Sequence, residues 1–340
     1  MHEALLWESE GGRVHCLLCP HDCRIAVGSR GVCGVRENRD GVLQASTYGL
    51  VLSIAVDPIE KKPVFHYRPG TSALSLGSVG CSMRCGHCQN WQISRARPGA
   101  EDLLERLDPD GVVELARTHR CEGVAFTYNE PVIWIEYVAD VARLCHEAGL
   151  YTVMVTNGYI TRAGLDLIGP LIDVWRVDVK AFDDGVFREF CHAHSVRPVL
   201  EAAERAKTRW GMHVEVVTNV VPTINDDDDT LSAIASWVAS ALGPDTPWHV
   251  TRFFPYLDLA HLPPTPTETL MRAREIGGAA GLHFVFAGNV RIPGAEDTVC
   301  PSCGAVVIGR DGYTITSRST HGGACASCGT QLGIVEGDSA

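Results

Sequence analysis

The chain has 340 residues, of which 45% are hydrophobic, and its formal net charge is −12. This length suits one large barrel or several smaller units, and the hydrophobic content allows a sizeable core. The acidic balance and the lack of a dense Lys/Arg tract give no general attraction to nucleic acid or to anionic lipid, so neither partner is expected.

The start of the chain, MHEALLWESEGGRVHC, lacks the basic start and the apolar stretch of a secretory signal. No uninterrupted apolar run approaches membrane-spanning length. We therefore expect a cytoplasmic protein with no membrane partner. In such a reducing compartment, closely spaced cysteines indicate metal binding rather than disulfides.

From residue 73 onward, short runs rich in Val, Ile and aromatic residues alternate with longer stretches of helical period. The expected strands cover 73–79, 123–128, 151–156, 174–179, 213–221 and 248–254. The expected helices cover 101–119, 132–148, 161–171, 198–209, 229–242 and 267–280. Thr265 and Glu268 have the spacing of a capping box for the last helix, and Gly277 with Gly278 is expected to end it. Such alternation implies a parallel sheet with covered faces, either doubly wound or wholly or partly closed into a barrel.

Polar residues occur where several of these expected strands end. They are Asn129, Glu130, Asn157, Asp178 and Lys180, with Asn219 within the fifth strand and Arg252 near the end of the sixth. Each alone would suit a turn, a helix start or a solvated pair. Because the carboxyl ends of parallel strands meet at one rim, the set together predicts a ligand site there.

Three cysteines, Cys81, Cys85 and Cys88, follow the first expected strand in the stretch GCSMRCGHCQNWQI. A buried helix could have this spacing, but the segment lacks an apolar stripe. A cubane of four irons usually takes four cysteines, whereas three leave one iron open to an external chelate. If these three thiols hold such a cubane, its fourth iron is open to chemistry.

This C-x3-C-x2-C loop resembles the signature of the radical S-adenosylmethionine (SAM) superfamily. The resemblance implies an α/β fold built on a partial (β/α)6 TIM-like barrel, and a [4Fe-4S] cluster whose open iron is chelated by the amine and carboxylate of SAM. One electron from the cluster then cleaves SAM to a 5'-deoxyadenosyl radical, which abstracts hydrogen from a substrate. The resemblance also implies an electron donor such as a flavodoxin or a ferredoxin.

Other motifs extend this resemblance residue by residue. Asn129 and Glu130 stand in the superfamily's Gly-Gly-Glu-Pro-like stretch, which implies contact with the methionine ammonium. Asn157 lies in a Thr-Asn-Gly similar to that of pyruvate formate-lyase activating enzymes, which implies contact with the ribose or carboxylate. Asp178 and Lys180 resemble those enzymes' Asp-Leu-Lys, a cofactor or substrate contact. However, those enzymes usually carry Asp where this chain has Val155, which argues against glycyl-radical activation.

A longer resemblance runs through almost the whole chain. The segments CLLCPHDCRIAVGSRGVCGVRENRDG, DPIEKKPVFHY, CQNWQIS, TYNEP, TNGY, DVKAF, RFFP and LPPTPTETLMRARE and the terminal cysteine pairs resemble the AmmeMemoRadiSam system radical SAM enzymes. That family takes its name from genomic association with two other families. The resemblance implies the cofactor and leaves the substrate open.

Two outer cysteine clusters flank this core. Cys300, Cys303, Cys325 and Cys328 form two C-x2-C knuckles like those of a zinc ribbon, so zinc is expected there, although the same ligands can hold iron.

Cys16, Cys19, Cys23 and Cys33 are less regularly spaced. Zinc and a second iron–sulfur cluster are both open to this set, with zinc preferred because nothing in the spacing selects iron. A second cluster would give an electron path to the first.

Some residues are expected to have ordinary structural roles. Cys121, Cys145 and Cys191 are scattered and are expected to pack in the core or at the surface. Lys61 and Lys62 precede a proline; a substrate contact is open to them, but a surface turn is preferred.

The expected organisation has three parts: a Cys-rich N-terminal extension (1–70), a radical SAM core (71–295) and a zinc-ribbon-like module (296–340). The leading hypothesis is a radical SAM enzyme that acts on an unidentified substrate, either a small molecule or a protein. One alternative is an activase-like enzyme that installs a radical or modification on a protein partner. A second is a non-enzymatic iron–sulfur/zinc electron-transfer or scaffold protein, which would leave the rim residues without a purpose.

Overall fold

A computed structural model describes residues 2–95 and 104–337 of the chain. Its centre is an eight-stranded sheet with the strand order β16-β15-β14-β13-β12-β11-β9-β8. The strands are β8 (Ser53–Pro58), β9 (Ser72–Gly77), β11 (Gly123–Phe126), β12 (Tyr151–Thr156), β13 (Val174–Asp178), β14 (His213–Val220), β15 (Trp248–Arg252) and β16 (Val285–Gly288). Neighbours from β9 to β16 pair in parallel, and β8 pairs antiparallel to β9. Among the described residues β8 and β16 do not pair with each other, so the sheet is open.

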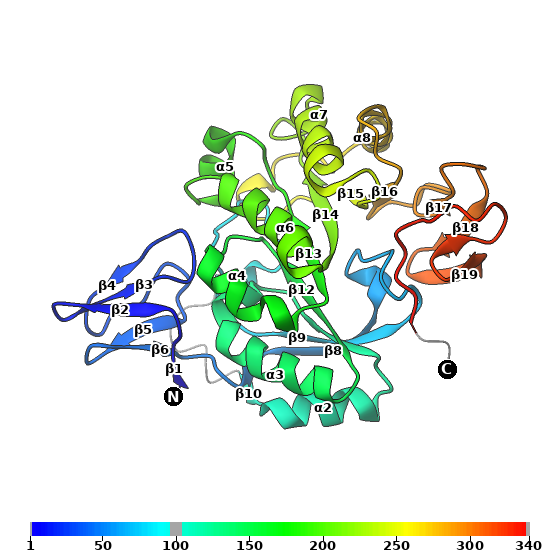
Figure 1. Cartoon of the computed structure of the whole chain (residues 1–340). Coiled ribbons are helices and arrows are strands. Elements are labelled where there is room, and N and C mark those ends of the chain that lie inside the picture. The colour runs from blue at the N-terminus through cyan, green and yellow to red at the C-terminus, as the bar shows by residue number, and fades with distance from the viewer. Residues whose placement is uncertain (1, 96–103, 338–340) are drawn as a thin grey trace.

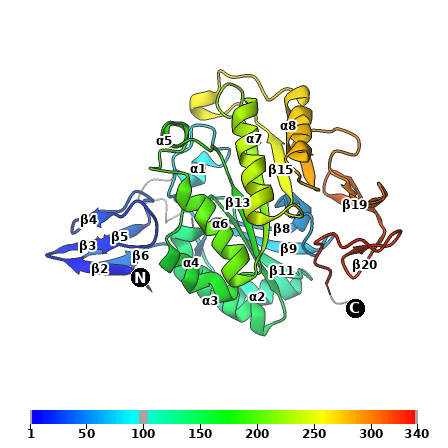
Figure 2. The ribbon, with the colours of Figure 1, turned by 45° about the horizontal axis from the view of Figure 1, so that its top comes forward.

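Helices cover one face of this sheet (Figures 1 and 2). They are α2 (Pro109–Thr118), α3 (Ile135–Glu147), α4 (Arg162–Ile168), α5 (Asp184–Cys191), α6 (Arg197–Trp210), α7 (Asp228–Trp237) and α8 (Thr267–Ala279). Side chains alternate between the two faces of each strand. On β13, Trp175 and Val177 belong to the main hydrophobic core, whereas Arg176 and Asp178 line a cavity. The alternation therefore separates a packed face from a functional face.

The six expected strands are confirmed, but the sequence interpretation missed β16, β8 and α5. The first expected helix begins only at Pro109, because Glu105–Arg106 form the short strand β10. Residues 101–103 of that prediction lie outside the described residues. The second expected helix is divided into a 3-10 turn (Pro131–Trp134) and α3.

The predicted capping box at the start of α8 is wrong. The Thr265 hydroxyl accepts a hydrogen bond from the backbone N–H of Phe253 at 2.8 Å and donates to the carbonyl of Val220 at 2.6 Å. It ties the helix start to the sheet instead of capping the helix. The helix also continues through the two glycines, Gly277 and Gly278, to Ala279.

Small antiparallel sheets lie on opposite sides of the central sheet (Figures 1 and 2). The N-terminal strands are β1 (His2–Glu3), β2 (Trp7–Glu10), β3 (Arg13–Cys16), β4 (Arg24–Ile25), β5 (Arg36–Arg39), β6 (Val42–Ala45) and β7 (Leu50–Val51). The C-terminal strands are β17 (Thr298–Val299), β18 (Val306–Asp311), β19 (Thr314–Arg318), β20 (Thr320–His321) and β21 (Ala324–Cys325). No helix in the described ranges has both the length and the apolar character needed to cross a membrane.

Candidate active site

Cys81, Cys85 and Cys88 lie on the loop that leaves the carboxyl end of β9. Gly80 starts this loop with φ +88°, in the left-handed region that favours glycine. A Cβ atom on Gly80 would lie 2.6 Å from the carbonyl oxygen of Cys33, so only glycine fits there. The loop is thus held against the N-terminal region immediately before its first thiol.

All three thiols line one cavity of about 390 Å³ on the functional face of the sheet. The cavity also takes in every predicted cofactor-binding residue: Asn129, Glu130, Asn157, Asp178 and Lys180. Asn219 lines it as well, whereas Arg252 does not belong to its lining. Parallel strands therefore bring these residues to one rim, although they are far apart in the sequence.

Glu130 is a buried carboxylate at this rim. It accepts hydrogen bonds from the backbone N–H of Val132 at 2.9 Å, from the Thr156 hydroxyl at 2.6 Å and from the backbone N–H of Asn157 at 2.8 Å. Burial raises the pKa of Glu130 to about 7, and the three hydrogen bonds oppose that rise. A cation brought beside Glu130 would favour the ionised form, so this carboxylate suits an ammonium ligand.

The two asparagines contact the cysteine loop directly. The Asn157 amide donates to the Ser82 hydroxyl at 3.1 Å and lies 3.7 Å from the Cys81 sulfur. The Asn129 amide donates to the carbonyl of Gly80 at 3.1 Å and accepts from the N–H of Ser78 at 3.0 Å. Both side chains therefore brace the loop as well as facing the cavity.

Asp178 and Lys180 form an ion pair of 2.8 Å at the end of β13, and Arg176 also binds Asp178. Burial alone would raise the pKa of Asp178, but the two cationic neighbours lower it to about 2. Asp178 therefore stays ionised at neutral pH, and the cluster carries a net positive charge toward the cavity. Such a cluster can accept a carboxylate or a polar hydroxyl group.

Cys191 lies beside the site, where the sequence interpretation expected only packing. Its thiol interacts with that of Cys85, and this interaction lowers the pKa of Cys85. The backbone N–H of Arg84 also donates to the carbonyl of Cys191 at 3.0 Å. The missed helix α5 carries Cys191, so no pattern in the sequence linked it to the three thiols.

Lys62 is a second missed residue, because it is buried in the cavity wall and not in a surface turn. Its ammonium lies 2.6 Å from the carboxylate of Asp57, and the Tyr128 hydroxyl donates to that carboxylate at 2.7 Å. Burial lowers the pKa of Lys62. The sequence does not show which of the two adjacent lysines is buried. Lys61 binds the other oxygen of Asp57 but is 44% exposed.

The far wall of the cavity comes from late strands and from the C-terminal region. His249 is buried and lies 2.6 Å from the carboxylate of Glu215. Glu296 and Tyr313 also line the cavity, and burial raises the pKa of Glu296 to about 7. The C-terminal region thus supplies part of the wall.

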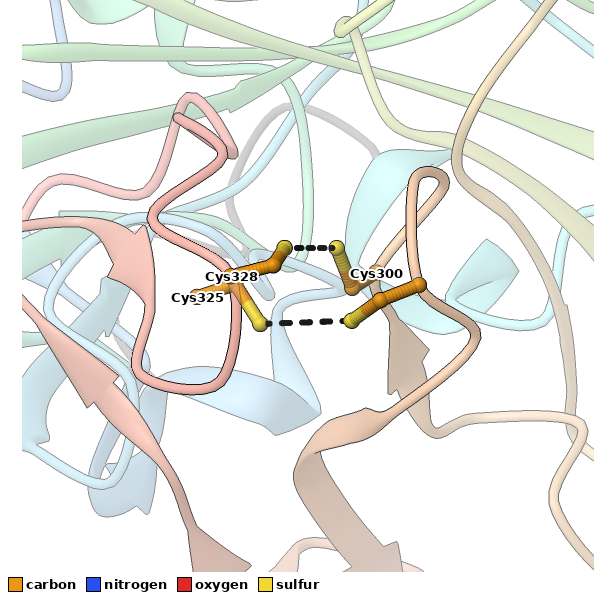
Figure 3. Close-up of side chains that lie close together, drawn as sticks. Cys300, Cys325 and Cys328 are labelled. Atoms are coloured by element: carbon orange, nitrogen blue, oxygen red, sulfur yellow. Dashed lines mark hydrogen bonds between the residues drawn. The ribbon is translucent and has the colours of Figure 1, made fainter.

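The C-terminal cysteines form a compact donor set (Figure 3). The sulfurs of Cys300, Cys303, Cys325 and Cys328 all lie within 4.8 Å of one another. Cys300 and Cys328 are 3.6 Å apart, and Cys303 and Cys325 are 3.7 Å apart. A disulfide needs about 2.05 Å, whereas four sulfurs about 2.3 Å from one central zinc are about 3.8 Å apart. The four cysteines could therefore hold a single metal ion.

Comparisons with known proteins place the chain in a superfamily. The sequence profile of the Radical SAM superfamily matches residues 76–234. Uncharacterized protein MJ0808 of Methanocaldococcus jannaschii is 40% identical over 338 residues, which cover 98% of this chain and all of that protein. The pyruvate formate-lyase-activating enzyme of Clostridium pasteurianum is 26% identical over 168 residues, which cover 46% of this chain and 65% of that enzyme.

The fold comparison adds a radical SAM methyltransferase from Sphaerobacter thermophilus. The two structures align with a TM-score of 0.51 at 17% identity. The alignment covers 64% of this chain and 66% of the methyltransferase chain. The chain belongs to the radical SAM superfamily and is related to pyruvate formate-lyase activating enzymes. It is therefore a radical SAM enzyme, for which the family implies a [4Fe-4S] cluster and SAM. Three thiols, a buried carboxylate and a cationic cluster around one cavity fit these two groups.

Proposed function

We propose that this enzyme belongs to the AmmeMemoRadiSam system branch of the superfamily and that its cavity binds SAM beside a [4Fe-4S] cluster on Cys81, Cys85 and Cys88. The observation that carries this proposal is the single cavity that joins the three thiols to Glu130 and to the Asp178–Lys180 pair. When bound, the cluster and SAM supply a 5'-deoxyadenosyl radical that abstracts hydrogen from the substrate. The protein's own residues position the groups and exclude water.

Each polar residue has a role that follows from its contacts. Glu130 accepts the methionine ammonium, because it is a buried carboxylate whose ionised form needs a cation. Asn129, the neighbour of Glu130 in the chain, lines the same cavity and holds the cysteine loop through Gly80. Asn157 serves the ribose or carboxylate, because its amide lies next to Cys81. Lys180 offers a positive charge to a carboxylate, and Asp178 fixes the lysine side chain.

The substrate occupies the part of the cavity beyond these residues. The cavity lining also includes Lys62, Arg176 and Glu296, which can carry charges of both signs, together with His249 and the rings of Phe65, Tyr128 and Tyr313. This lining favours a polar substrate with groups of both signs, either a small molecule or an exposed side chain of a protein. A flavodoxin or a ferredoxin supplies the electron.

Two structural features complete the proposal. The parallel strands β9 to β15 supply the six strands of a partial (β/α)6 barrel, and β16 extends it. The C-terminal cysteines hold structural zinc, because their sulfur separations of 3.6 and 3.7 Å match a tetrahedral ion and the set has no open position.

The test is SAM cleavage by the reconstituted enzyme. Anaerobic protein with SAM and dithionite should form 5'-deoxyadenosine. Cys85→Ala should abolish this product, whereas Cys121→Ala, a buried cysteine away from the cavity, should retain it. Deuterium transfer from candidate substrates into deoxyadenosine, or a mass change on a polypeptide, then identifies the substrate class. Continued cleavage by Cys85→Ala would refute the assignment.

A further inference from the structure

We propose that Cys16, Cys19, Cys23 and Cys33 bind a second [4Fe-4S] cluster, which passes one electron at a time to the cluster on Cys81, Cys85 and Cys88. The spacing of these four cysteines along the chain does not distinguish zinc from iron. Their arrangement in the fold favours an iron–sulfur cluster.

The four N-terminal thiols gather in one place although they come from separate segments. Cys19 interacts electrostatically with Cys16, Cys23 and Cys33. The backbone N–H of Cys16 donates to the carbonyl of Cys23 at 2.9 Å, which joins the first and third segments.

The separation of these sulfurs favours a cluster over a single ion. Among the described residues, only the C-terminal cysteines bring three or more possible ligand atoms within 4.8 Å of one another. A single tetrahedral ion holds its four sulfurs about 3.8 Å apart. A cubane has an iron at each ligated corner and spreads its cysteine sulfurs more widely. Cys81, Cys85 and Cys88, for which the family implies iron, likewise do not form a set of sulfurs within 4.8 Å of one another.

Arg36 provides an independent observation. Its guanidinium is 2% exposed and interacts electrostatically with Cys16 and Cys33. One end of the guanidinium binds Glu136 at 2.9 Å and the carbonyl of Leu5 at 2.6 Å, but Nε is buried with no hydrogen-bond partner. The inorganic sulfides of a cluster add acceptors that a single ion lacks. A cluster would therefore satisfy a donor that is otherwise unpaired beside the thiols.

The segments that carry the N-terminal cysteines contact the active-site loop directly. The carbonyl oxygen of Cys33 packs against Gly80, the residue before Cys81. His21, between two of the N-terminal cysteines, has its Nε2 2.6 Å from the carbonyl of Ser82. The C-terminal strands β17, β18 and β19 lie on the opposite side of the central sheet from the N-terminal strands (Figure 1). Direct contact with the active-site loop therefore suits the N-terminal site for electron transfer.

The relay step rests on the proposed function, because it needs iron at the active-site loop. An external one-electron donor protein reduces the N-terminal cluster. That cluster is oxidised again as it reduces the active-site cluster by one electron, and no covalent bond forms or breaks. The site itself does not depend on the proposed function, so the two can fail separately.

Metal analysis of the full chain, reconstituted anaerobically with iron and sulfide, tests the site. Wild type should hold about eight irons and about one zinc per chain. Cys19→Ala and Cys33→Ala should lose about half the iron and keep the zinc. The matched variant Cys303→Ala, at the C-terminal site, should lose zinc and keep the iron. Loss of zinc from Cys19→Ala with unchanged iron would overturn the proposal.

If the variants fail to fold, the metal content of the wild-type protein alone tests for a second cluster. About four irons and about two zincs per chain would refute a second cluster. After dithionite reduction, electron paramagnetic resonance should show two magnetically interacting clusters, and a signal from one isolated cluster would refute the relay. If eight irons are present but no deoxyadenosine forms, the proposed function fails while the N-terminal site stands.

Discussion

Cys191 lies beside the cluster thiols and could act as a fourth iron ligand. Its thiol interacts with that of Cys85, and its backbone binds Arg84 of the cysteine loop, so Cys191 is a candidate rival ligand for the open iron. The proposed function reserves that iron for SAM, and Cys191 then only adjusts Cys85. Cys191→Ala should therefore keep the iron content of wild type and at least half its rate of deoxyadenosine formation. Iron loss as large as that of Cys85→Ala would instead make Cys191 a ligand.

Asp57 and Lys62 form the buried ion pair of the cavity wall. Asp57→Asn leaves the ammonium of Lys62 buried without a charge partner, which should cost about 3 to 5 kcal/mol of unfolding free energy. Lys61→Ala removes the 44% exposed partner of the same carboxylate and should cost less than about 1 kcal/mol. Thermal unfolding of both variants, measured with equal metal content, provides the comparison. Equal losses of unfolding free energy in the two variants would show that burial does not determine the strength of the Asp57–Lys62 ion pair.

The residues that could be predicted from the sequence are those fixed by strand alternation. Glu130, Asn157 and Asp178 follow buried hydrophobic runs, so the parallel sheet had to bring them to one rim. Lys62 and Tyr313 come from segments outside that alternation. Their contact with the cavity depends on packing between segments far apart in the chain, which the local residue pattern does not reveal.

At the scale of elements, the loop after β9 depends on one glycine. Gly80→Ala would place a Cβ 2.6 Å from the carbonyl of Cys33 in the left-handed region, so it should displace the loop from the N-terminal segment. We expect a loss of stability together with a lower iron content. Gly278→Ala is the matched control, because a Cβ there meets nothing within 4 Å in helix α8. That change should raise stability by about 0.5 to 1 kcal/mol and leave iron unchanged.

Full iron content in Gly80→Ala would contradict the proposed close packing of the two cysteine regions. Unfolding curves and iron analysis on the same samples give both readouts.

The elements that the sequence missed have identifiable physical causes. Strand β16 is only four residues long and ends in glycine, so it has little hydrophobic pattern of its own. Helix α5 carries a usable signal, since the Asp183 side chain accepts from the N–H groups of Gly185 and Val186. The false capping box at Thr265 arose because a hydroxyl can bond to distant backbone groups as well as to its own helix.

At the scale of the whole molecule, the C-terminal region is joined to the core through Arg310. Its guanidinium lies 4.2 Å from the ring centre of Phe65 and donates to the carbonyl of that residue at 2.8 Å. Because Tyr313 of the same region lines the cavity, a metal ion bound by the C-terminal cysteines should affect both stability and the site.

Removal of zinc with a chelator that leaves iron in place should therefore lower the unfolding temperature by about 5 °C or more and reduce substrate turnover. Deoxyadenosine formation without substrate should change less. An unchanged unfolding temperature after complete zinc loss would contradict a structural role for these cysteines. Calorimetry paired with metal analysis measures this directly.

The central claim is that three thiols leave one iron of the active-site cluster open for SAM. Mössbauer spectroscopy of the ⁵⁷Fe-reconstituted enzyme, recorded before and after addition of SAM, tests it most directly. The account predicts that one iron of one cluster changes its coordination when SAM binds. A spectrum that SAM leaves unchanged, with every iron already held by a protein thiolate, would contradict it.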